Sequence, residues 1–477
     1  MGRLQAQNAA ADARARETQV NLRDLEIYLA AGQQALLKAR GDFAVLKTKV
    51  EASKPLDPVK FSELRDMAEQ IDAILTVTTT HDDRAPGTVS GPGRAIAFII
   101  DRSGSMESNG NIEAAKHAAR VCINLLDENT RFCVVAFSSK AEVLVPLCPA
   151  THLVNKELAH GQIQSLVPEG GTAFSNALLA ARQELDKLDG GIRYALFLTD
   201  GANDAVDRPH LKSAVKACQG RFQCDGRGIG ADWEKADLTF IANTLLGNAD
   251  IIPRTEMMEA AFREAIAAAL AKGVADVHLR LWMPRTVAVG TIKQVSPEIV
   301  DLAELAVRKD DHTLEIPTGA WADETRDYHL TLTFKPGEIG DEMLACRPSL
   351  VYADGGREVV VPGSTSVVAA WTSDETISTR IDPQVAHYTG QQELADSIRE
   401  GLAARDRGDV DHATKLLGKA VKIASDSGNE EVTRRLKHVV DIVDAPQATV
   451  RLRSAVSKVD EMVLDLGGTR TVKRKTG

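Results

Sequence analysis

The sequence predicts an α/β fold with a doubly wound, mostly parallel sheet, accompanied by a β-sandwich and flanking helical segments. Between residues 93 and 271 apolar strands alternate with helices, which is typical of a parallel sheet buried on both faces. After Gly273 the hydrophobic period changes to two, as in Val277 and Leu279, and this favours antiparallel strands with one face in water. A chain of 477 residues is long enough for about three such domains.

The first 80 residues are rich in Ala, Gln, Glu, Lys and Leu, and the apolar residues from Leu22 to Leu29 fall at helical spacing. We therefore expect an N-terminal helical segment over residues 1–80, with its last helix at about residues 60–75. Glycines and prolines concentrate in the stretch that follows, so residues 81–92 are expected to form a linker.

The central region, residues 93–271, is expected to form one domain. Parallel sheets bind ligands at the carboxyl ends of their strands, and Asp101 and Asp200 each follow an apolar strand. The expected strands are residues 95–100, 131–138, 141–147, 194–199, 222–230 and 249–252, and the expected helices are residues 112–126, 172–188, 209–217, 233–246 and 254–271.

Three further segments complete the predicted organisation. Alternating residues over 272–383 predict a small β-sandwich domain. Residues 384–466 predict a C-terminal helical segment containing a hairpin of the tetratricopeptide type. The polar residues 467–477 are expected to be a disordered tail.

Composition excludes several classes of function. A net charge of −10 argues against bulk binding of nucleic acid, which needs a cationic surface. No apolar run approaches the roughly 20 residues that span a membrane, and the N-terminus lacks the pattern of a secretory signal. The six cysteines form no C-x-x-C pair, so free thiols in a reducing cytoplasm are expected.

Five oxygen-bearing side chains form the candidate site. The loop Asp101-Arg102-Ser103-Gly104-Ser105 follows an apolar strand and offers one carboxylate and two hydroxyls. Thr172 follows a glycine pair at a predicted helix start, and Asp200 ends a second apolar strand. Two carboxylates and three hydroxyls suit a hard divalent cation such as Mg²⁺ and leave one coordination position open. The candidate metal ligands are therefore Asp101, Ser103, Ser105, Thr172 and Asp200.

These residues match the metal-ion-dependent adhesion site (MIDAS) of von Willebrand factor type A (VWA) domains, which residues 93–271 resemble. The resemblance implies a Rossmann-like fold in which Ser103, Ser105 and Thr172 ligate Mg²⁺, with Mn²⁺ or Ca²⁺ as alternatives. By the same resemblance, Asp101 and Asp200 act through water or through hydrogen bonds to the serines. The open position would accept an Asp or Glu carboxylate from a partner protein.

Each residue also has a simpler interpretation. Ser103 and Ser105 suit a turn, Thr172 suits a helix N-cap, and Asp200 suits a tight turn before glycine. Asp101 suggests a phosphatase of the haloacid-dehalogenase type, but that chemistry needs a second carboxylate two residues later, where Ser103 stands.

A serine nucleophile would need a neighbouring base, and the nearest histidine, His117, lies on a predicted helix face. We therefore predict a protein that is not an enzyme.

The chain resembles bacterial stand-alone members of the family, which implies a cytoplasmic adaptor in stress-response or signalling complexes. The partners implied are AAA-type ATPases or kinase and phosphatase components. The resemblance also implies that the helix over residues 254–271 acts as a lever into the sandwich. A second hypothesis is an oligomeric scaffold that assembles through its N-terminal helices and holds the metal only for stability.

Overall fold

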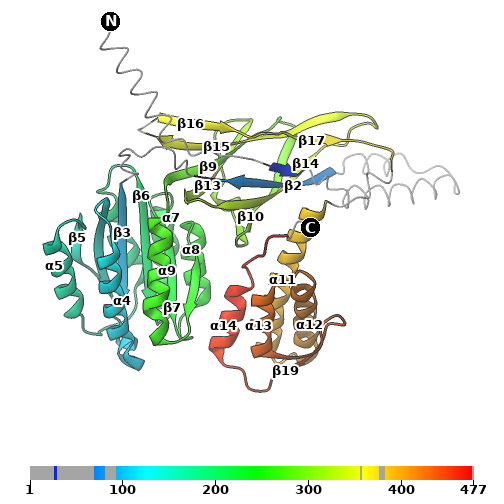
Figure 1. The fold of residues 1–477 in the computed structure, drawn as a ribbon. Coiled ribbons are helices and arrows are strands. Elements are labelled where there is room, and N and C mark those ends of the chain that lie inside the picture. Colours follow the sequence, from blue (N-terminus) through cyan, green and yellow to red (C-terminus); the bar gives the residue numbers. More distant parts are fainter. Residues whose placement is uncertain (1–25, 29–68, 81–92, 355–356, 375–381, 475–477) are drawn as a thin grey trace, which may run out of the picture.

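The computed structural model describes residues 26–28, 69–80, 93–354, 357–374 and 382–474 (Figure 1). An α/β domain, a β-sandwich and a C-terminal helical segment stand beside one another, with the sandwich lying across the end of the α/β domain (Figure 1). No helix among these residues has the length and apolar character that a membrane span requires.

The α/β domain is built on a six-stranded sheet of order β5-β4-β3-β6-β7-β8, in which β5 alone runs antiparallel to its neighbour. The predicted doubly wound, mostly parallel sheet is confirmed. The strands are β3 (Arg94–Asp101), β4 (Thr130–Phe137), β5 (Ala141–Pro149), β6 (Ile192–Thr199), β7 (Gln223–Ile229) and β8 (Ala249–Ile252).

Helices cover both faces of this sheet. The first face carries α4, α5 and α9, and the second carries α6, α7 and α8. The helices are α4 (Asn111–Leu125), α5 (Leu153–Gln164), α6 (Phe174–Leu185), α7 (Arg208–Cys218), α8 (Lys235–Thr244) and α9 (Met258–Leu270), with 3-10 turns η1 (Gly104–Gly110) and η2 (Thr255–Met257).

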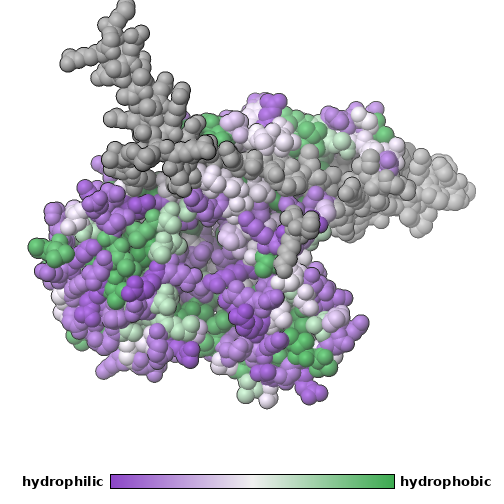
Figure 2. Space-filling view, in the orientation of Figure 1, coloured by the Kyte–Doolittle hydropathy of each residue, from purple (hydrophilic) through white to green (hydrophobic). Residues whose placement is uncertain are grey.

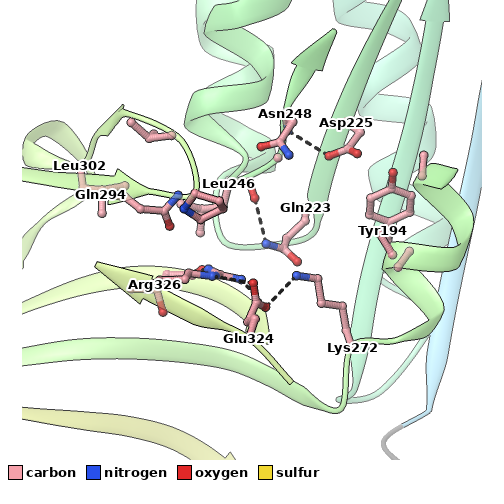
Figure 3. A pocket seen from close by; sticks show the side chains of 17 residues that line it. Tyr194, Gln223, Asp225, Leu246, Asn248, Lys272, Gln294, Leu302, Glu324 and Arg326 are labelled. Carbon is pink, nitrogen blue, oxygen red and sulfur yellow. Dashed lines mark hydrogen bonds and ion pairs between the residues drawn. The ribbon is translucent and has the colours of Figure 1, made fainter. Parts of the chain in front are cut away.

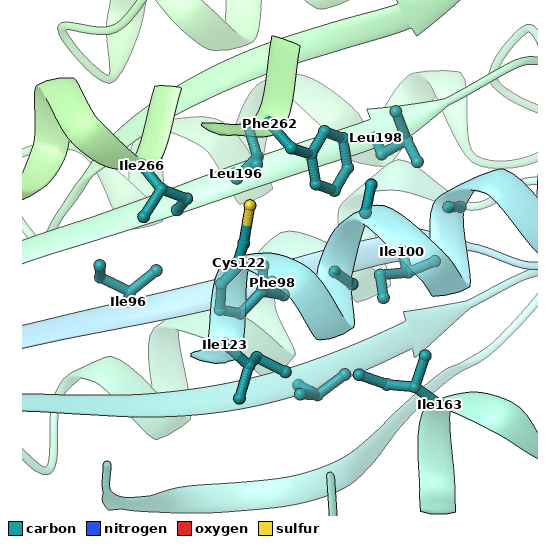
Figure 4. Close-up of a cluster of buried hydrophobic side chains, with 14 of the residues drawn as sticks. Ile96, Phe98, Ile100, Cys122, Ile123, Ile163, Leu196, Leu198, Phe262 and Ile266 are labelled. Atoms are coloured by element: carbon teal, nitrogen blue, oxygen red, sulfur yellow. The ribbon is translucent and has the colours of Figure 1, made fainter. Parts of the chain in front are cut away.

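Strand β3 explains how the two cores form. Its side chains alternate, so Phe98 and Ile100 enter the core under α4 and α9, whereas Ala97 and Ile99 enter the core under α6 and α7. Figure 4 shows Phe98 and Ile100 near Phe262 of α9. Burying one such large side chain contributes about 2 kcal/mol, which fixes α4 and α9 against the central strands.

One face of the molecule is mostly hydrophilic (Figure 2). A small apolar patch is visible at the left edge, where α5 lies, and Leu153, Val154 and Leu158 are exposed apolar residues of this helix. Only Ala159 and Ile163 of α5 are buried, and this weak amphipathic pattern explains why the sequence did not predict the helix.

The β-sandwich has two antiparallel sheets, of order β1-β2-β14-β10-β11 and β12-β13-β9-β15-β16, with β17 also paired to β15. Trp321 and Tyr328 are among its largest fully buried side chains. The strands are β9 (Val274–Trp282), β10 (Val287–Ser296), β11 (Val300–Asp301), β12 (Val307–Arg308), β13 (Thr313–Trp321), β14 (Thr325–Phe334), β15 (Glu342–Asp354), β16 (Arg357–Pro362) and β17 (Val367–Ala370).

The predicted N-terminal helix over residues 60–75 is wrong where the structure describes it. Residues Glu69–Thr78 form strand β2, which pairs along its whole length with β14, and Glu26–Tyr28 forms the short strand β1 beside it. Alternate residues of β2 enter the sandwich core, namely Ile71, Ala73, Leu75 and Val77. This period of two is that of a strand and not of a helix. The rest of the 1–80 prediction and the 81–92 linker lie outside the described residues.

Because β2 precedes the α/β domain and β9 follows it, that domain is inserted into the sandwich. Where the chain passes between the two, the Arg94 guanidinium donates a 3.0 Å hydrogen bond to the carbonyl of Lys272. The Gly273 amide in turn donates to the carbonyl of Trp321. Arg94, near the start of the α/β domain, and Lys272, just after its end, therefore lie side by side at the amino end of β3.

The C-terminal segment is a helical hairpin, α11 (Pro383–Asp406) and α12 (Val410–Asp426), followed by α13 (Glu430–Val439) and α14 (Lys458–Gly467). The purely helical prediction for residues 384–466 is wrong at one place, because β18 (Val440–Asp444) and β19 (Thr449–Leu452) form a two-stranded hairpin between α13 and α14.

The expectation of a disordered tail is also wrong over residues 468–474. The amide of Ile299 donates to the carbonyl of Thr469, and the amide of Thr471 donates to the carbonyl of Pro297, each at 2.9 Å. His387 contacts the carbonyl of Val472 at 2.6 Å. Backbone hydrogen bonds to the sandwich therefore order a polar segment that lacks an apolar pattern of its own. Residues 475–477 lie outside the described part of the chain.

A pocket of about 150 Å³ lies between the α/β domain and the sandwich (Figure 3). Lys272 lies two residues after the end of α9, and its ammonium is 3.1 Å from the Glu324 carboxylate of the sandwich. Arg326 also donates to Glu324, at 2.8 Å, and Gln223 donates to the carbonyl of Leu246 at 2.9 Å. Charged and amide groups that satisfy one another therefore line this junction.

Candidate metal centre

The five predicted ligand residues lie in three loops at the carboxyl edge of the sheet. Asp101 is the last residue of β3, and Asp200 directly follows β6. These strands are parallel neighbours, paired from Arg94 with Ile192 to Ile100 with Leu198, so their ends meet at the same edge. The third loop brings Thr172 to that edge from the turn before α6.

Direct hydrogen bonds join four of the five residues. The Ser103 amide donates to the Asp101 carboxylate at 2.7 Å, and the Ser103 and Ser105 hydroxyl oxygens lie 3.0 Å apart. The Ser105 hydroxyl donates to Asp200 Oδ1 at 2.5 Å. A line of polar contacts thus runs from the end of β3 to the end of β6, with both serine hydroxyls in its middle.

Thr172 reaches the same place through its backbone. Its amide donates to the Asp204 carboxylate at 2.8 Å. The Gly104 amide donates to the carbonyl of Gly170 at 3.1 Å, which ties the Thr172 loop to the loop after β3. A Cβ added at Gly201 would lie 3.2 Å from the Ser105 hydroxyl and 3.5 Å from the Thr172 hydroxyl. The structure therefore joins Asp101, Ser103, Ser105 and Asp200 by hydrogen bonds, and the hydroxyls of Ser105 and Thr172 both lie near Gly201.

The simpler interpretation of Thr172 as a helix cap is wrong. Helix α6 begins at Phe174, its N-cap residue is Ala173, and no side-chain hydrogen bond comes from that cap. The first free amides of the helix are bound by side chains from the loop after β6 instead: Asn203 accepts from Phe174 at 3.1 Å, and Asp207 accepts from Ser175 at 2.9 Å. The Thr172 hydroxyl is thus not used in capping.

Two buried carboxylates dominate the electrostatics of the site. Asp101 is fully buried and Asp200 is 5% exposed. Burial raises the pKa of Asp101 to about 6, although hydrogen bonds from Ser103 and Thr199 oppose the rise. No Lys, Arg or His of the described chain forms an ion pair with either carboxylate. Buried anions are costly unless they are paired, so this donor set fits a cation.

Three supporting residues were not identified from the sequence. The Thr199 hydroxyl donates to Asp101 Oδ2 at 2.6 Å, and the Asn111 side-chain amide donates to Asp200 Oδ2 at 2.9 Å. Asp204 holds the Thr172 loop, as described above. Thr199 was recognisable as the last residue of a strand beside Asp101, whereas Asn111 and Asp204 become neighbours of the site only through the fold.

A pocket of about 450 Å³ opens beside the site. Ser105, Asn111 and Asp200 line part of it. The turns after β7 and β8 also line it and carry both signs of charge, with Asp232, Arg254 and Glu256 all exposed. The pocket is therefore accessible from outside next to the Ser105 hydroxyl.

The arrangement does not match a serine nucleophile with a histidine base. Ser103 and Ser105 contact each other and Asp200, and His117 instead lies 3.0 Å from Glu259 between α4 and α9. Nucleophilic activation requires the base to lie within hydrogen-bond distance of the hydroxyl. In the part of the chain that the structure describes, no histidine has that contact with either serine.

Comparisons with known proteins agree with this fold. Residues 96–203 match the model of the von Willebrand factor type A domain, and residues 422–468 match the model of a von Willebrand factor type A C-terminal domain. The second match falls on the end of α12, α13, the β18–β19 hairpin and α14.

One similar solved structure is a von Willebrand factor type A protein from Catenulispora acidiphila. It is 38% identical, with a TM-score of 0.79, and the match covers 85% of this chain and 93% of that one. The ArnB paralog VWA2 from Sulfolobus acidocaldarius is 15% identical with a TM-score of 0.51, over 85% of this chain and 95% of that one. The second likeness shows a shared fold alone.

Among curated sequences, an uncharacterized protein of Synechocystis is 28% identical over 240 residues. The match covers 48% of this chain and 53% of the Synechocystis protein, so the chain spans about half the length of that relative.

Proposed function

The chain belongs to the von Willebrand factor type A family, and from that premise we propose that it is a protein-interaction module whose metal centre captures an acidic side chain of a partner. Asp101, Ser103, Ser105, Thr172 and Asp200 would hold the cation, which the hard oxygen donors favour as Mg²⁺, with Mn²⁺ or Ca²⁺ as alternatives. The cation would supply an electrophilic centre for a carboxylate.

The observation that carries the proposal is the contact between Ser105 and Asp200. Because the Ser105 hydroxyl donates its hydrogen bond to Asp200, it accepts one from the Ser103 hydroxyl, and the second lone pair of the Ser105 oxygen remains for a cation. Asp200 thereby acts as a hydrogen-bond acceptor that orients the Ser105 hydroxyl. A centre whose direct ligands are largely neutral hydroxyls retains most of the positive charge of the ion, and an incoming Glu or Asp then binds well.

The neighbouring pocket supports binding of a protein rather than of a small metabolite. It is open, it is lined by Ser105 and Asp200, and its lining also includes Asp232, Arg254 and Glu256. Exposed charges of both signs suit the polar rim of a protein interface, where they contribute to specificity.

The family resemblance supports a proposal for the biological setting. We place the protein in the bacterial cytoplasm as an adaptor in stress-response or signalling complexes, with AAA-type ATPases or kinase and phosphatase components as partners. The competing scaffold hypothesis attributes assembly to the N-terminal segment and gives the metal only a stabilising role.

Capture experiments with the purified full-length chain test the proposal. Wild type, Thr172→Ala and Asp101→Ala are immobilised and exposed to native lysate in Mg²⁺ or in EDTA. We expect a specific protein to bind wild type in Mg²⁺ and to be lost with EDTA or with either substitution. Ser213→Ala, on the exposed surface of α7, is the matched control and should behave as wild type.

Calorimetric titration with Mg²⁺ and light scattering complete the test. Wild type should bind one ion, and Thr172→Ala should bind it at least tenfold more weakly while remaining folded. Capture that is indifferent to EDTA and to Thr172→Ala would refute the proposal. A change of molecular mass on adding EDTA would favour the scaffold instead.

A further inference from the structure

The sandwich ends on one side in a strand whose outer edge is open. Strand β16 is the last strand of the sheet of order β12-β13-β9-β15-β16, and all six of its residues pair with β15. Among the residues that the structure describes, no strand pairs with its other side. Figure 1 shows β16 at the top of the sandwich, on the side away from the α/β domain. The α/β domain therefore leaves this edge uncovered.

The pairing with β15 determines which backbone groups of β16 point outward. Directly after the strand, the Gly363 amide donates to the carbonyl of Pro348 at 2.9 Å, so these two opposite residues form a hydrogen-bonded pair. In an antiparallel ladder such pairs alternate with pairs that are not hydrogen-bonded. The odd-numbered residues of β16 therefore bond to β15. The N–H and C=O groups of Glu358 and Val360 point to the open edge, and so does the carbonyl of Pro362.

The side chains of this edge are apolar where an added strand would cover them. Val359 and Val361 lie opposite Tyr352 and Leu350 on the core face, and both valines are only half-buried. Val360, on the other face, is 47% exposed. Soluble proteins usually protect an exposed edge with lysine, proline or a bulge, and the three central valines of β16 include none of these. Such an edge is suited to further strand pairing.

The carboxylate of Glu358 decides between the registers in which two copies of this edge could pair. Nη1 and Nη2 of Arg280 each donate to it at 3.0 Å, on the outer face of the sheet. A two-fold axis at Val359 would bring Glu358 of the two copies diagonally across from each other, with like charges within about 8 Å. An axis at Val360 places Pro362 of the other copy opposite Glu358. The two Glu358 residues are then about 13 Å apart along the strands.

We propose that the open edge of β16 binds the same edge of a second copy of this chain, antiparallel and centred on Val360. The two Val360 residues exchange a pair of N–H···O=C bonds. The Glu358 amide of each copy donates to the Pro362 carbonyl of the other, so the N–H that proline lacks costs no bond that these residues could otherwise form with a donor. On the core face, Val359 of each copy covers Val361 of the other. Pairing joins the two six-stranded sheets into one continuous sheet.

The expected dimer is weak and does not depend on a metal. A contact over one strand of six residues buries less than the roughly 800 Å² that each partner contributes to a standard interface. We therefore expect a dissociation constant in the micromolar range or weaker. The edge belongs to the sandwich, whereas the candidate metal centre belongs to the α/β domain. Failure of cation binding would accordingly leave this inference intact, and EDTA should not change the dimer.

Sedimentation velocity of the full-length chain at rising concentration tests the dimer, with Val360→Pro as the variant. Proline removes an outward N–H and no bond to β15, and an edge strand tolerates it there, so the variant should melt at the temperature of wild type. Both central hydrogen bonds of the pair are lost, and we expect dimerisation to weaken at least tenfold. Val360→Ile keeps the amide and the branched apolar side chain, and should dimerise as wild type does.

Cysteine cross-linking tests the register. Val360→Cys places the two Cα atoms about 5.5 Å apart across the axis, a distance that a disulfide spans. Glu358→Cys places them about 13 Å apart, which no disulfide spans. Under oxidation we expect a covalent dimer of Val360→Cys, and none of Glu358→Cys or of wild type, whose six cysteines are buried or half-buried.

Three results would overturn the inference. A wild-type chain that is still monomeric at about 1 mM would exclude a second copy as the occupant and leave an extended segment of another protein. A dimer that Val360→Pro does not weaken would form through another surface. Cross-linking of Glu358→Cys in place of Val360→Cys would show a different register from the one that the charges favour.

Discussion

The ammonium group of Lys272 lies 3.1 Å from the carboxylate of Glu324, and this contact joins the end of the α9 segment to the beginning of β14. Arg326 donates to the same carboxylate at 2.8 Å and packs over the Trp321 ring at 4.2 Å. Burial alone would raise the pKa of Glu324, but the charge and hydrogen bond of Arg326 and the charge of Lys272 outweigh it and hold the pKa at about 2. The junction between the two domains therefore depends on an ionised Glu324.

Glu324→Gln is predicted to destabilise the protein in a pH-dependent way. Because the pKa of Glu324 falls from 4.5 to about 2 on folding, its contribution is fully present above pH 4.5 and disappears as the pH falls through 2. The shift of this pKa corresponds to about 3 kcal/mol in the free energy of unfolding at pH 7. Urea denaturation at pH 7 and pH 3 measures it, with the exposed Glu304→Gln as control. Equal losses at both pH values would contradict the prediction.

Cation binding is predicted to weaken in mild acid. The pKa of Asp101 is raised to about 6 in the metal-free protein, so the proton competes with the cation below that pH. At pH 5 about one tenth of Asp101 is ionised, and Mg²⁺ affinity should be roughly tenfold lower than at pH 7. Calorimetry in two buffers of different ionisation enthalpy would detect the released proton. An affinity that stays constant from pH 7 to pH 5 would exclude this role of Asp101.

Removal of β2 is predicted to unfold the sandwich while the α/β domain remains folded. A chain that begins at residue 93 lacks the strand that pairs with β14 and contributes Ile71 and Leu75 to the sandwich core. Limited proteolysis should then cleave within residues 274–370 far faster than in the full chain. Co-expression with residues 1–92 should restore resistance, and persistent resistance of the truncated chain without them would show that β2 is dispensable.

The residues after α14 are predicted to hold the helical segment against the other two domains. Thr469 and Thr471 bond to the sandwich, and Arg470 forms ion pairs with Asp250 of the α/β domain and Glu431 of α13. Deleting residues 469–477 should increase the radius of gyration measured by small-angle X-ray scattering. Deletion of residues 475–477 alone serves as the matched control, and an unchanged radius in both would argue against this clamp.

The sequence was most informative where hydrophobic period and local motif coincide. The run ending at Asp101 predicted β3 and its loop, because a buried parallel strand is apolar throughout and ends in polar residues. Thr172 and Asp200 could be added because their loops carry the same kind of oxygen donor. The fold then joined four of these residues by hydrogen bonds and placed the Thr172 hydroxyl near Gly201, beside that of Ser105.

Contacts between residues far apart in the sequence limited the prediction of the other elements. Residues 69–78 contain glutamate, glutamine and alanine, which suit a helix, yet pairing with β14 more than 240 positions later makes them a strand. Residues 468–474 are ordered by backbone hydrogen bonds that no side-chain pattern reveals. Asn111 is recognisable only once α4 lies beside the loop after β6.

The α/β domain is attached to the sandwich at the end where Arg94 and Lys272 lie side by side. This attachment also determines how the domain can move. When a domain attached at one end rotates as a rigid body, its greatest displacement occurs at the end remote from the attachment. The candidate metal centre lies at that remote end, since β3 runs eight residues, about 25 Å, from Arg94 to Asp101. A few degrees of tilt at the Lys272–Glu324 contact would therefore displace the candidate site by about an ångström or more. If the proposed function holds, such a tilt would reorient a bound partner as well as hold it.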